Sequence, residues 1–176
     1  GVNGFVTSVT LLPEINLGVV VLTNTDQNAF FQMLKWEIID AYLELPYRNY
    51  DEYSFKRSSL QIQERDAQRS AWRDSVALNI NPEIDLNSFT GTYMHEVYGY
   101  ANLSLKENYL EMKLQHHSKV IGKLEYIGNN RFLCTYSDPT YGIKIFPFEI
   151  KDSKVVSFDL YVDDFIDYQA YKFVKQ

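Results

Sequence analysis

The chain has 176 residues, 45% of them hydrophobic and 23% charged, a balance that excludes disordered, collagen-like and coiled-coil proteins. Aromatic residues are unusually frequent, with 14 Tyr and 11 Phe against 8 Gly, which favours strands with one half-buried face. The net charge of −6 divides into −5 before Ser88 (7 Lys and Arg against 12 Asp and Glu) and −1 from there on (10 against 11). Neither part is basic, so nucleic acid and anionic membranes are not expected as partners.

The single cysteine, Cys134, excludes an internal disulfide and a cysteine-rich zinc site. No apolar run reaches the ~18 residues of a membrane-spanning helix. The opening Gly-Val-Asn-Gly also lacks the features of a signal peptide. We therefore expect no membrane span, and a chain that is part of a longer protein.

The first segment, residues 1–46, is predicted to form a β-hairpin followed by a helix. Two β-rich runs, 5–12 and 17–23, flank a turn that contains Pro13. The second run is apolar on both faces, which favours a strand covered on both sides. Apolar residues then recur at three- and four-residue spacing over 30–45, which indicates a helix. One helix cannot cover both faces of the hairpin, so this segment is typical of the end of a larger domain.

Residues 47–85 are polar and charged, with a weak helical stripe of apolar residues. We interpret this segment as a partly helical connector that packs through Trp72 and ends at residues 79–82, Asn-Ile-Asn-Pro. Alternating charges of this kind usually form a solvated face.

From residue 86 to 176 the hydrophobic period changes to two. Alternating runs occur around Tyr93 and at 102–106, 110–114, 124–126, 131–135, 146–150, 158–162 and 171–173. Turn residues separate them, so about eight strands are expected in an antiparallel meander. Closure into a barrel would remove the exposed edges. The predicted fold is mainly β, an eight-stranded antiparallel barrel preceded by a β-hairpin and one or two helices.

A catalytic serine is not indicated by any motif. The chain has neither Gly-x-Ser-x-Gly nor Ser-x-x-Lys. Tyr-x-Asn occurs at Tyr47-Arg48-Asn49 and Tyr100-Ala101-Asn102, but no serine–lysine pair precedes either, and so short a match is expected by chance in a tyrosine-rich chain. We predict no catalytic residue in this chain.

Metal and cofactor sites are not expected either. His116 and His117 would point to opposite faces of a strand, and turn positions are the expected setting for them and for His95. Three carboxylates near one turn lack the glycine and terminal glutamate of an EF-hand, and ordinary hairpin carboxylates are the favoured interpretation: Asp163, Asp164 and Asp167. Cys134 is expected to be a small buried hydrophobic residue.

The first quarter of the chain resembles the end of the serine β-lactamase-like family, which includes class C β-lactamases, penicillin-binding proteins and related esterases and peptidases. The residues that carry the resemblance are Gly4-Phe5-x-Thr-Ser, the Pro13 turn and the Leu-Gly-Val-Val-Val-Leu-Thr-Asn run at 17–24, with 30–45 matching the family's C-terminal helix. The resemblance implies a truncated serine hydrolase whose serine, lysine and Tyr-x-Asn lie upstream. It also implies a periplasmic or exported parent protein, although a cytoplasmic one stays open.

Residues 86–176 are similar to the DUF3471 family, a lipocalin-like domain often appended to such hydrolases. Leu86-x-x-Phe89-x-Gly91-x-Tyr93, Tyr98-Gly99 and Tyr171-x-Phe173 carry the similarity. It implies a non-catalytic accessory domain that is structural, oligomerises the enzyme or modulates access to its active site. The alternative is a module that binds a small apolar ligand or peptide, although bulky interior residues favour a filled barrel. The expected partners are the upstream hydrolase domain and a second copy, through residues 5–45.

Overall fold

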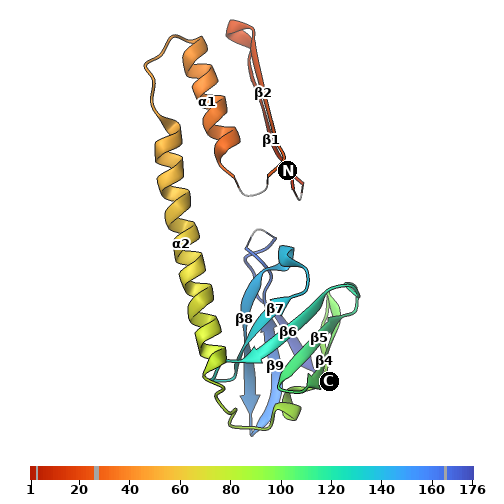
Figure 1. Ribbon diagram of the computed structural model, residues 1–176. Helices are drawn as coiled ribbons and strands as arrows, with labels where there is room; N and C mark the ends of the chain where they lie inside the picture. Colours follow the sequence, from red (N-terminus) through yellow and green to blue (C-terminus); the bar gives the residue numbers. More distant parts are fainter. Residues whose placement is uncertain (3, 26–27, 165) are drawn as a thin grey trace. The chain divides into compact units, whose positions relative to one another are not determined.

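The computed structural model describes residues 1–2, 4–25, 28–164 and 166–176. The chain forms two units, residues 1–66 and 67–176 (Figure 1). Helix α2 (Tyr50–Ala77) runs from the first unit into the second.

The first unit contains the predicted hairpin and helix. Strands β1 (Val6–Leu12) and β2 (Leu17–Thr23) pair antiparallel around a short 3-10 turn, η1 (Pro13–Ile15), and helix α1 (Phe30–Tyr42) packs on the sheet. A small core of Val19, Val21 and Ile39 fills the contact. Strand side chains alternate between the sheet's two faces, so these valines share the face that α1 covers.

The other face of the hairpin is bare, which differs from the predicted cover on both sides. Within the described residues, Val9 and Leu11 of β1 are 66% and 70% exposed, and Val20 and Leu22 of β2 are 60% and 74% exposed. The register places Val9 directly opposite Val20. Apolar residues therefore occupy both faces of this ribbon, and α1 reaches only one of them.

The polar segment expected to be partly helical is one helix over most of its length. Asn49 begins α2, because its Oδ1 accepts the Glu52 N–H at 3.3 Å and its amide donates to the Glu52 carboxylate at 2.9 Å. The helix ends at Ala77. Near that end Arg73 binds the barrel through Glu125 and Thr135, both at 2.6 Å, while Trp72 is half-buried.

The second unit is the predicted closed, eight-stranded antiparallel barrel (Figure 1). Each strand pairs with its neighbours in sequence, and the last strand closes the barrel against the first. The strands are β3 (Gly91–His95), β4 (Gly99–Lys106), β5 (Tyr109–Leu114), β6 (Ile121–Tyr126), β7 (Arg131–Tyr136), β8 (Ile143–Lys151), β9 (Lys154–Leu160) and β10 (Tyr171–Lys175).

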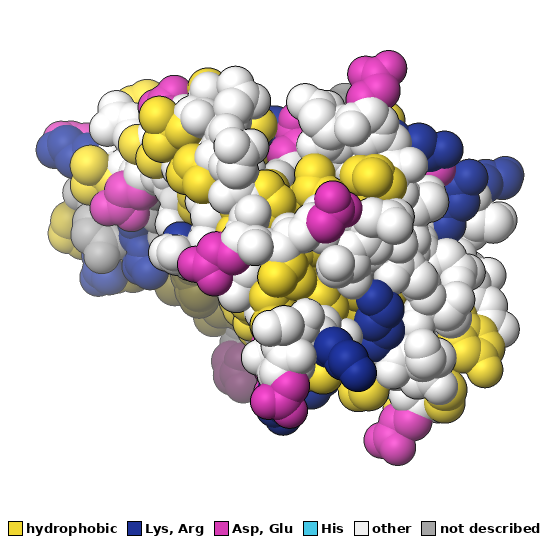
Figure 2. Space-filling view, turned by 90° about the horizontal axis from the view of Figure 1, so that it is seen from below, with side chains coloured by type: hydrophobic (Ala, Val, Ile, Leu, Met, Phe, Trp, Pro, Cys, Tyr) yellow, Lys and Arg dark blue, Asp and Glu magenta, His cyan; other side chains and the backbone are white. Residues whose placement is uncertain are grey.

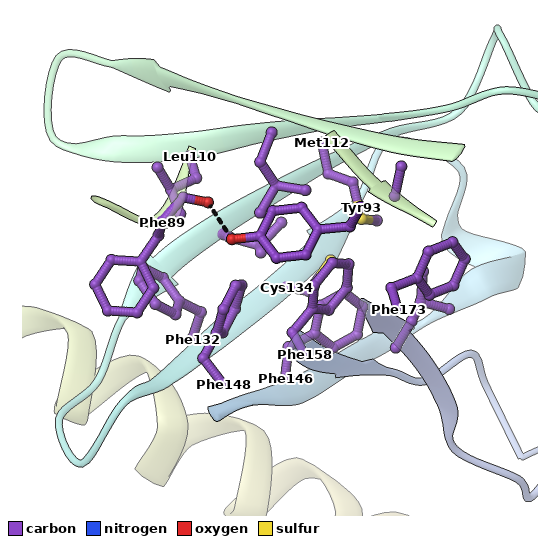
Figure 3. Packing of buried hydrophobic residues seen from close by; sticks show 14 of the residues in the cluster. Phe89, Tyr93, Leu110, Met112, Phe132, Cys134, Phe146, Phe148, Phe158 and Phe173 are labelled. Carbon is purple, nitrogen blue, oxygen red and sulfur yellow. Dashed lines mark hydrogen bonds between the residues drawn. The ribbon is translucent and has the colours of Figure 1, made fainter. Parts of the chain in front are cut away.

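The interior of the barrel is filled mainly by aromatic rings (Figure 3). Phe158 stacks with Phe148 and Phe173 at centroid distances of 5.0 and 5.5 Å. Phe89, from the 3-10 turn η2 (Leu86–Phe89), meets Phe132 edge to face at 5.0 Å. Offset-stacked and edge-to-face arrangements are favourable because of the quadrupoles of aromatic rings. These ring contacts therefore stabilise the core in addition to the burial of apolar surface.

The surface of the chain carries no concentration of positive charge on the face drawn in Figure 2, where Lys and Arg are scattered among acidic, uncharged and hydrophobic side chains.

Helix α2 has the length to cross a bilayer but is strongly polar. Among the helices of the described residues, none combines the length and the apolarity that a membrane span requires.

Candidate functional site

The two ends of the barrel differ. Because the strands run alternately up and down, four loops gather at one end, which we call the mouth: residues 96–98, 115–120, 137–142 and, in the last loop, 161–164 and 166–170. At the opposite end η2 places Phe89 inside the barrel, fully buried. The Tyr93 hydroxyl donates a 2.7 Å hydrogen bond to the Phe89 carbonyl and holds η2 in place at this end of the barrel (Figure 3).

The mouth holds a cavity of about 370 Å³, which is within the usual range for small-ligand sites. Buried Leu160 and Phe173 line it, so it adjoins the core. Aliphatic and aromatic side chains form most of the wall, with a few polar groups among them: Val97, Tyr98, Leu114, His116, His117, Tyr141, Leu160, Val162, Ile166, Asp167, Tyr171 and Phe173.

One wall of the cavity is formed by Tyr98, Tyr171 and Phe173, whose rings pack around the ring of His95. The His95 ring lies 5.0 Å from Tyr98 and 5.4 Å from Phe173, and Tyr98 meets Tyr171 edge to face at 4.7 Å. His95 Nδ1 accepts the N–H groups of Val97 and Tyr98 at 3.1 and 3.2 Å. Nδ1 is therefore the acceptor, which places the proton of the neutral ring on Nε2. This histidine shapes the turn that presents Tyr98.

Asp167 is the charged residue of the cavity wall. The Tyr171 hydroxyl donates to Asp167 Oδ2, and the Gln169 N–H donates to Oδ1 at 3.0 Å. These bonds, chiefly that from Tyr171, hold the pKa of Asp167 below its usual value. The same contact raises the pKa of Tyr171 well above its usual value. A carboxylate held by these donors is thus kept ionised at the mouth.

His116 and His117 both line the cavity, from the loop between β5 and β6. His117 Nδ1 lies 3.4 Å from the Tyr141 hydroxyl. Gly99 makes room on this side: its φ is 71°, and a Cβ there would lie 2.3 Å from Gln115 Oε1 and 3.1 Å from His116 Nε2. Both rings are exposed and offer nitrogen atoms to a bound molecule.

The cavity wall is mostly apolar, with a few polar groups that converge on it. No serine, cysteine or lysine side chain is among the described residues that line it. An apolar cavity with a few convergent polar groups is the usual form of a small-ligand site.

The model of one protein family, the domain of unknown function DUF3471, matches residues 77–175, which is more than half of the chain. The chain belongs to the DUF3471 family. The match begins at the last residue of α2 and includes all eight strands of the barrel. Comparison with curated proteins found no match, and comparison with solved structures found none either.

The two Tyr-x-Asn strings lie outside the cavity of the DUF3471 domain. Asn49 of the first is the residue that begins α2. In the second, Ala101 points into the core while Tyr100 and Asn102 face outward, and Asn102 Oδ1 accepts the Thr92 hydroxyl at 2.8 Å. Each string therefore has a local structural role.

The histidines and aspartates are placed partly as predicted. His116 and His117 lie in a turn, but the argument from opposite strand faces is wrong, because both line one cavity. Asp164 forms an ion pair with Lys144, whereas Asp167 reaches the cavity. Among the described residues no three His, Cys, Asp or Glu side chains gather closely enough to hold a metal ion.

Cys134 is fully buried in the core, as predicted, and burial raises the pKa of its thiol well above the usual value. Sequence reasoning missed the loop residues that complete the cavity, above all Tyr98, Tyr141 and Ile166. The sequence holds only a weak signal for these cavity residues, namely the apolar Val97 and Ile166 in segments expected to be loops. In the structure these two side chains are 70% and 46% exposed.

Proposed function

We propose that residues 1–46 are the end of a serine hydrolase domain of the β-lactamase and penicillin-binding-protein type, and that the DUF3471 barrel is its non-catalytic C-terminal accessory domain. The observation that carries this proposal is the bare apolar face of the hairpin, where Val9, Leu11, Val20 and Leu22 are each at least 60% exposed. A ribbon that is apolar on both faces favours a place inside a larger layered sheet.

The core of the barrel supports an accessory role. The buried residues of the barrel pack on one another, as expected for an appended domain that folds by itself. Its role would be to support the hydrolase, to bring copies of it together or to modulate access to its active site. The partners would be the upstream hydrolase domain and, through residues 5–45, a second copy. The expected location of the parent protein is the periplasm or outside the cell.

Two measurements test this proposal. The coding sequence upstream of the codon for Gly1 should encode Ser-x-x-Lys first and Tyr-x-Asn second. A Lys/His-x-Gly strand should follow these two motifs. The purified chain should not hydrolyse nitrocefin or p-nitrophenyl esters above background. Turnover by the purified chain would overturn the non-catalytic role, and an upstream sequence of another class would overturn the hydrolase parent.

A second candidate function is the binding of a small ligand at the mouth, and the cavity of about 370 Å³ favours it. We propose that an apolar molecule binds between the loop at 96–98 and residues 161–164 and 166–170. In an NMR titration, octanol should shift amide signals of these loops saturably and leave those of residues 127–130, at the other end, unchanged. Shifts that do not saturate, or that are equal at both ends, would contradict a site at the mouth.

A further inference from the structure

We propose that the cavity at the mouth binds an amphipathic cation, an alkylammonium or arylalkylammonium compound, with its hydrocarbon part among the apolar walls and its charged head at Asp167. This inference rests on the ligand-binding function proposed above and names the class of ligand. It is carried by four features: the apolar depth of the cavity, a carboxylate that pairs with no lysine or arginine among the described residues, two tyrosine rings of the same wall, and the charge of the surrounding loops.

The inner part of the cavity takes hydrocarbon. Leu114, Leu160, Val162 and Phe173 line it, and Leu160 and Phe173 also belong to the buried core. Water in contact with such walls has few hydrogen-bond partners, so its replacement by a hydrocarbon chain is favourable. A small hydrophilic ion alone would leave this contact unused.

Asp167 supplies the site for the charge. In the part of the chain that the structure describes, no lysine or arginine forms an ion pair with it; the Tyr171 hydroxyl and the Gln169 N–H donate to it, and the Tyr168 N–H contributes a smaller contact. An ionised carboxylate has about four acceptor positions. These three donors leave room for a hydrogen bond from an ammonium head. Because the donors hold the carboxylate, little side-chain freedom is lost on binding.

The aromatic side chains favour the same charge. Tyr98 and Tyr171 line the cavity with their rings 4.7 Å apart, and the Tyr171 hydroxyl contacts Asp167. Electron-rich rings of this kind attract cations that reach their faces. The ring nitrogens of His116 and His117 are further polar groups of the wall.

The loops of the mouth disfavour an anion. They carry five carboxylates and one lysine, which gives −4 with the histidines neutral: Glu96, Asp138, Asp163, Asp164 and Asp167 against Lys119. Lys144 lies close by on β8, but it forms an ion pair with Asp164. A cleft lined by one sign of charge raises the local concentration of the opposite ion. A fatty acid would place its carboxylate against this field.

The test compares three ligands with the same tail. Octylammonium, octanol and octanoate are titrated into the complete chain by calorimetry at pH 8, above the range in which histidine ordinarily titrates. We expect octylammonium to bind about tenfold or more tightly than octanol, the usual gain from a charge-assisted hydrogen bond, and octanoate to bind most weakly. Ethylammonium, which lacks the tail, should bind far more weakly than octylammonium.

The variant Asp167→Asn removes the charge but can still accept from Tyr171. It should bind octylammonium and octanol equally, with octanol affinity unchanged. Asp152→Asn is the matched control, because it removes a carboxylate from the turn between β8 and β9, at the opposite end of the barrel, where φ is 49° and Asn is well tolerated. It should keep the preference for the cation.

The outcomes separate the two proposals. Equal affinity for the three ligands, tighter binding of octanoate, or an unchanged cation preference in Asp167→Asn overturns the cation inference and leaves the binding function standing. No binding of any of the three overturns both. If Asp167→Asn fails to fold in a thermal melt, the order of affinities in the wild-type chain still decides the question.

Discussion

The hydroxyl of Tyr93 is a polar group inside an aromatic core. Burial raises the pKa of this hydroxyl well above the usual value. It donates to the Phe89 carbonyl at 2.7 Å. Tyr93→Phe should lower the free energy of unfolding by about 1–2 kcal/mol, because the buried carbonyl loses its donor. Urea unfolding measures the change. Tyr168→Phe, the same change at a side chain that is 82% exposed, is the control and should cost almost nothing.

Gly122 shows how tightly a strand can approach the core. A Cβ on this residue of β6 would lie 2.9 Å from Met112 Cε and 3.1 Å from Cys134 Sγ. Both neighbours are fully buried, so a shift of either would disturb the core around it. Gly122→Ala should therefore destabilise the barrel by about 1–3 kcal/mol, the usual cost of overpacking.

A double variant tests whether the contact with Met112 causes the destabilisation by Gly122→Ala. Met112→Val removes the closest clashing atom, so the two changes together should cost less than the sum of the two singles in urea unfolding. Strict additivity would mean that the methionine contact is not the cause.

At the scale of elements, Glu149 connects three strands. From β8 its carboxylate accepts from Ser157 on β9 at 2.9 Å and from Lys172 on β10 at 3.2 Å, and it pairs with Lys151 at 2.8 Å. These contacts, with Lys151 first, lower the pKa of Glu149 from 4.5 to about 2. The folded state therefore binds this proton less readily than the unfolded state, and the contribution to stability exists above pH 4.5.

Glu149→Gln should accordingly reduce stability at pH 7 and lose its effect in acid. The difference in the free energy of unfolding between wild type and variant should shrink as the pH falls from 4.5 toward about 2. Urea unfolding between pH 7 and pH 2 measures it. Glu107→Gln, in the turn between β4 and β5, is the control and should show no such trend. A constant difference across this range would contradict the role of Glu149.

The elements differ in how far they could be predicted. All eight barrel strands were recognisable from the sequence, because apolar and polar side chains alternate along much of them, as in Leu110 and Met112 on β5. The length of α2 was underestimated, since its stripe of apolar residues is weak and most of its side chains are solvated. A local signal for its start existed in Asn49 and Glu52.

The cavity could not be predicted, because its residues come together only when the barrel closes. Tyr98, His117, Tyr141 and Asp167 belong to four different loops, and no local pattern connects them. Turn positions were expected for His116 and His117, but the alternation of a strand was taken to separate them, whereas in the turn both line one cavity. Closure of a barrel thus creates sites that periodicity alone does not indicate.

At the scale of the whole molecule, the two units are stabilised very differently. The barrel has an extensive aromatic core, whereas the core of residues 1–66 consists of Val19, Val21 and Ile39 with a few half-buried neighbours. The bare face of β1 and β2 adds an apolar surface of the kind that seeks a partner. The association state of the chain should therefore depend on this face.

We expect the wild-type chain to self-associate as its concentration rises, and the double variant Val9→Lys/Val20→Glu to stay monomeric. These two residues are directly opposite each other on the bare face, so the new charges attract and the hairpin keeps its register. Sedimentation velocity over a concentration series measures the difference. The matched control is Met94→Lys/Tyr100→Glu, an exposed apolar pair that is also directly opposite, on β3 and β4 of the barrel, and it should associate like the wild type. A wild-type chain that is monomeric throughout, or a control that loses association equally, would show that the hairpin face is not the interface.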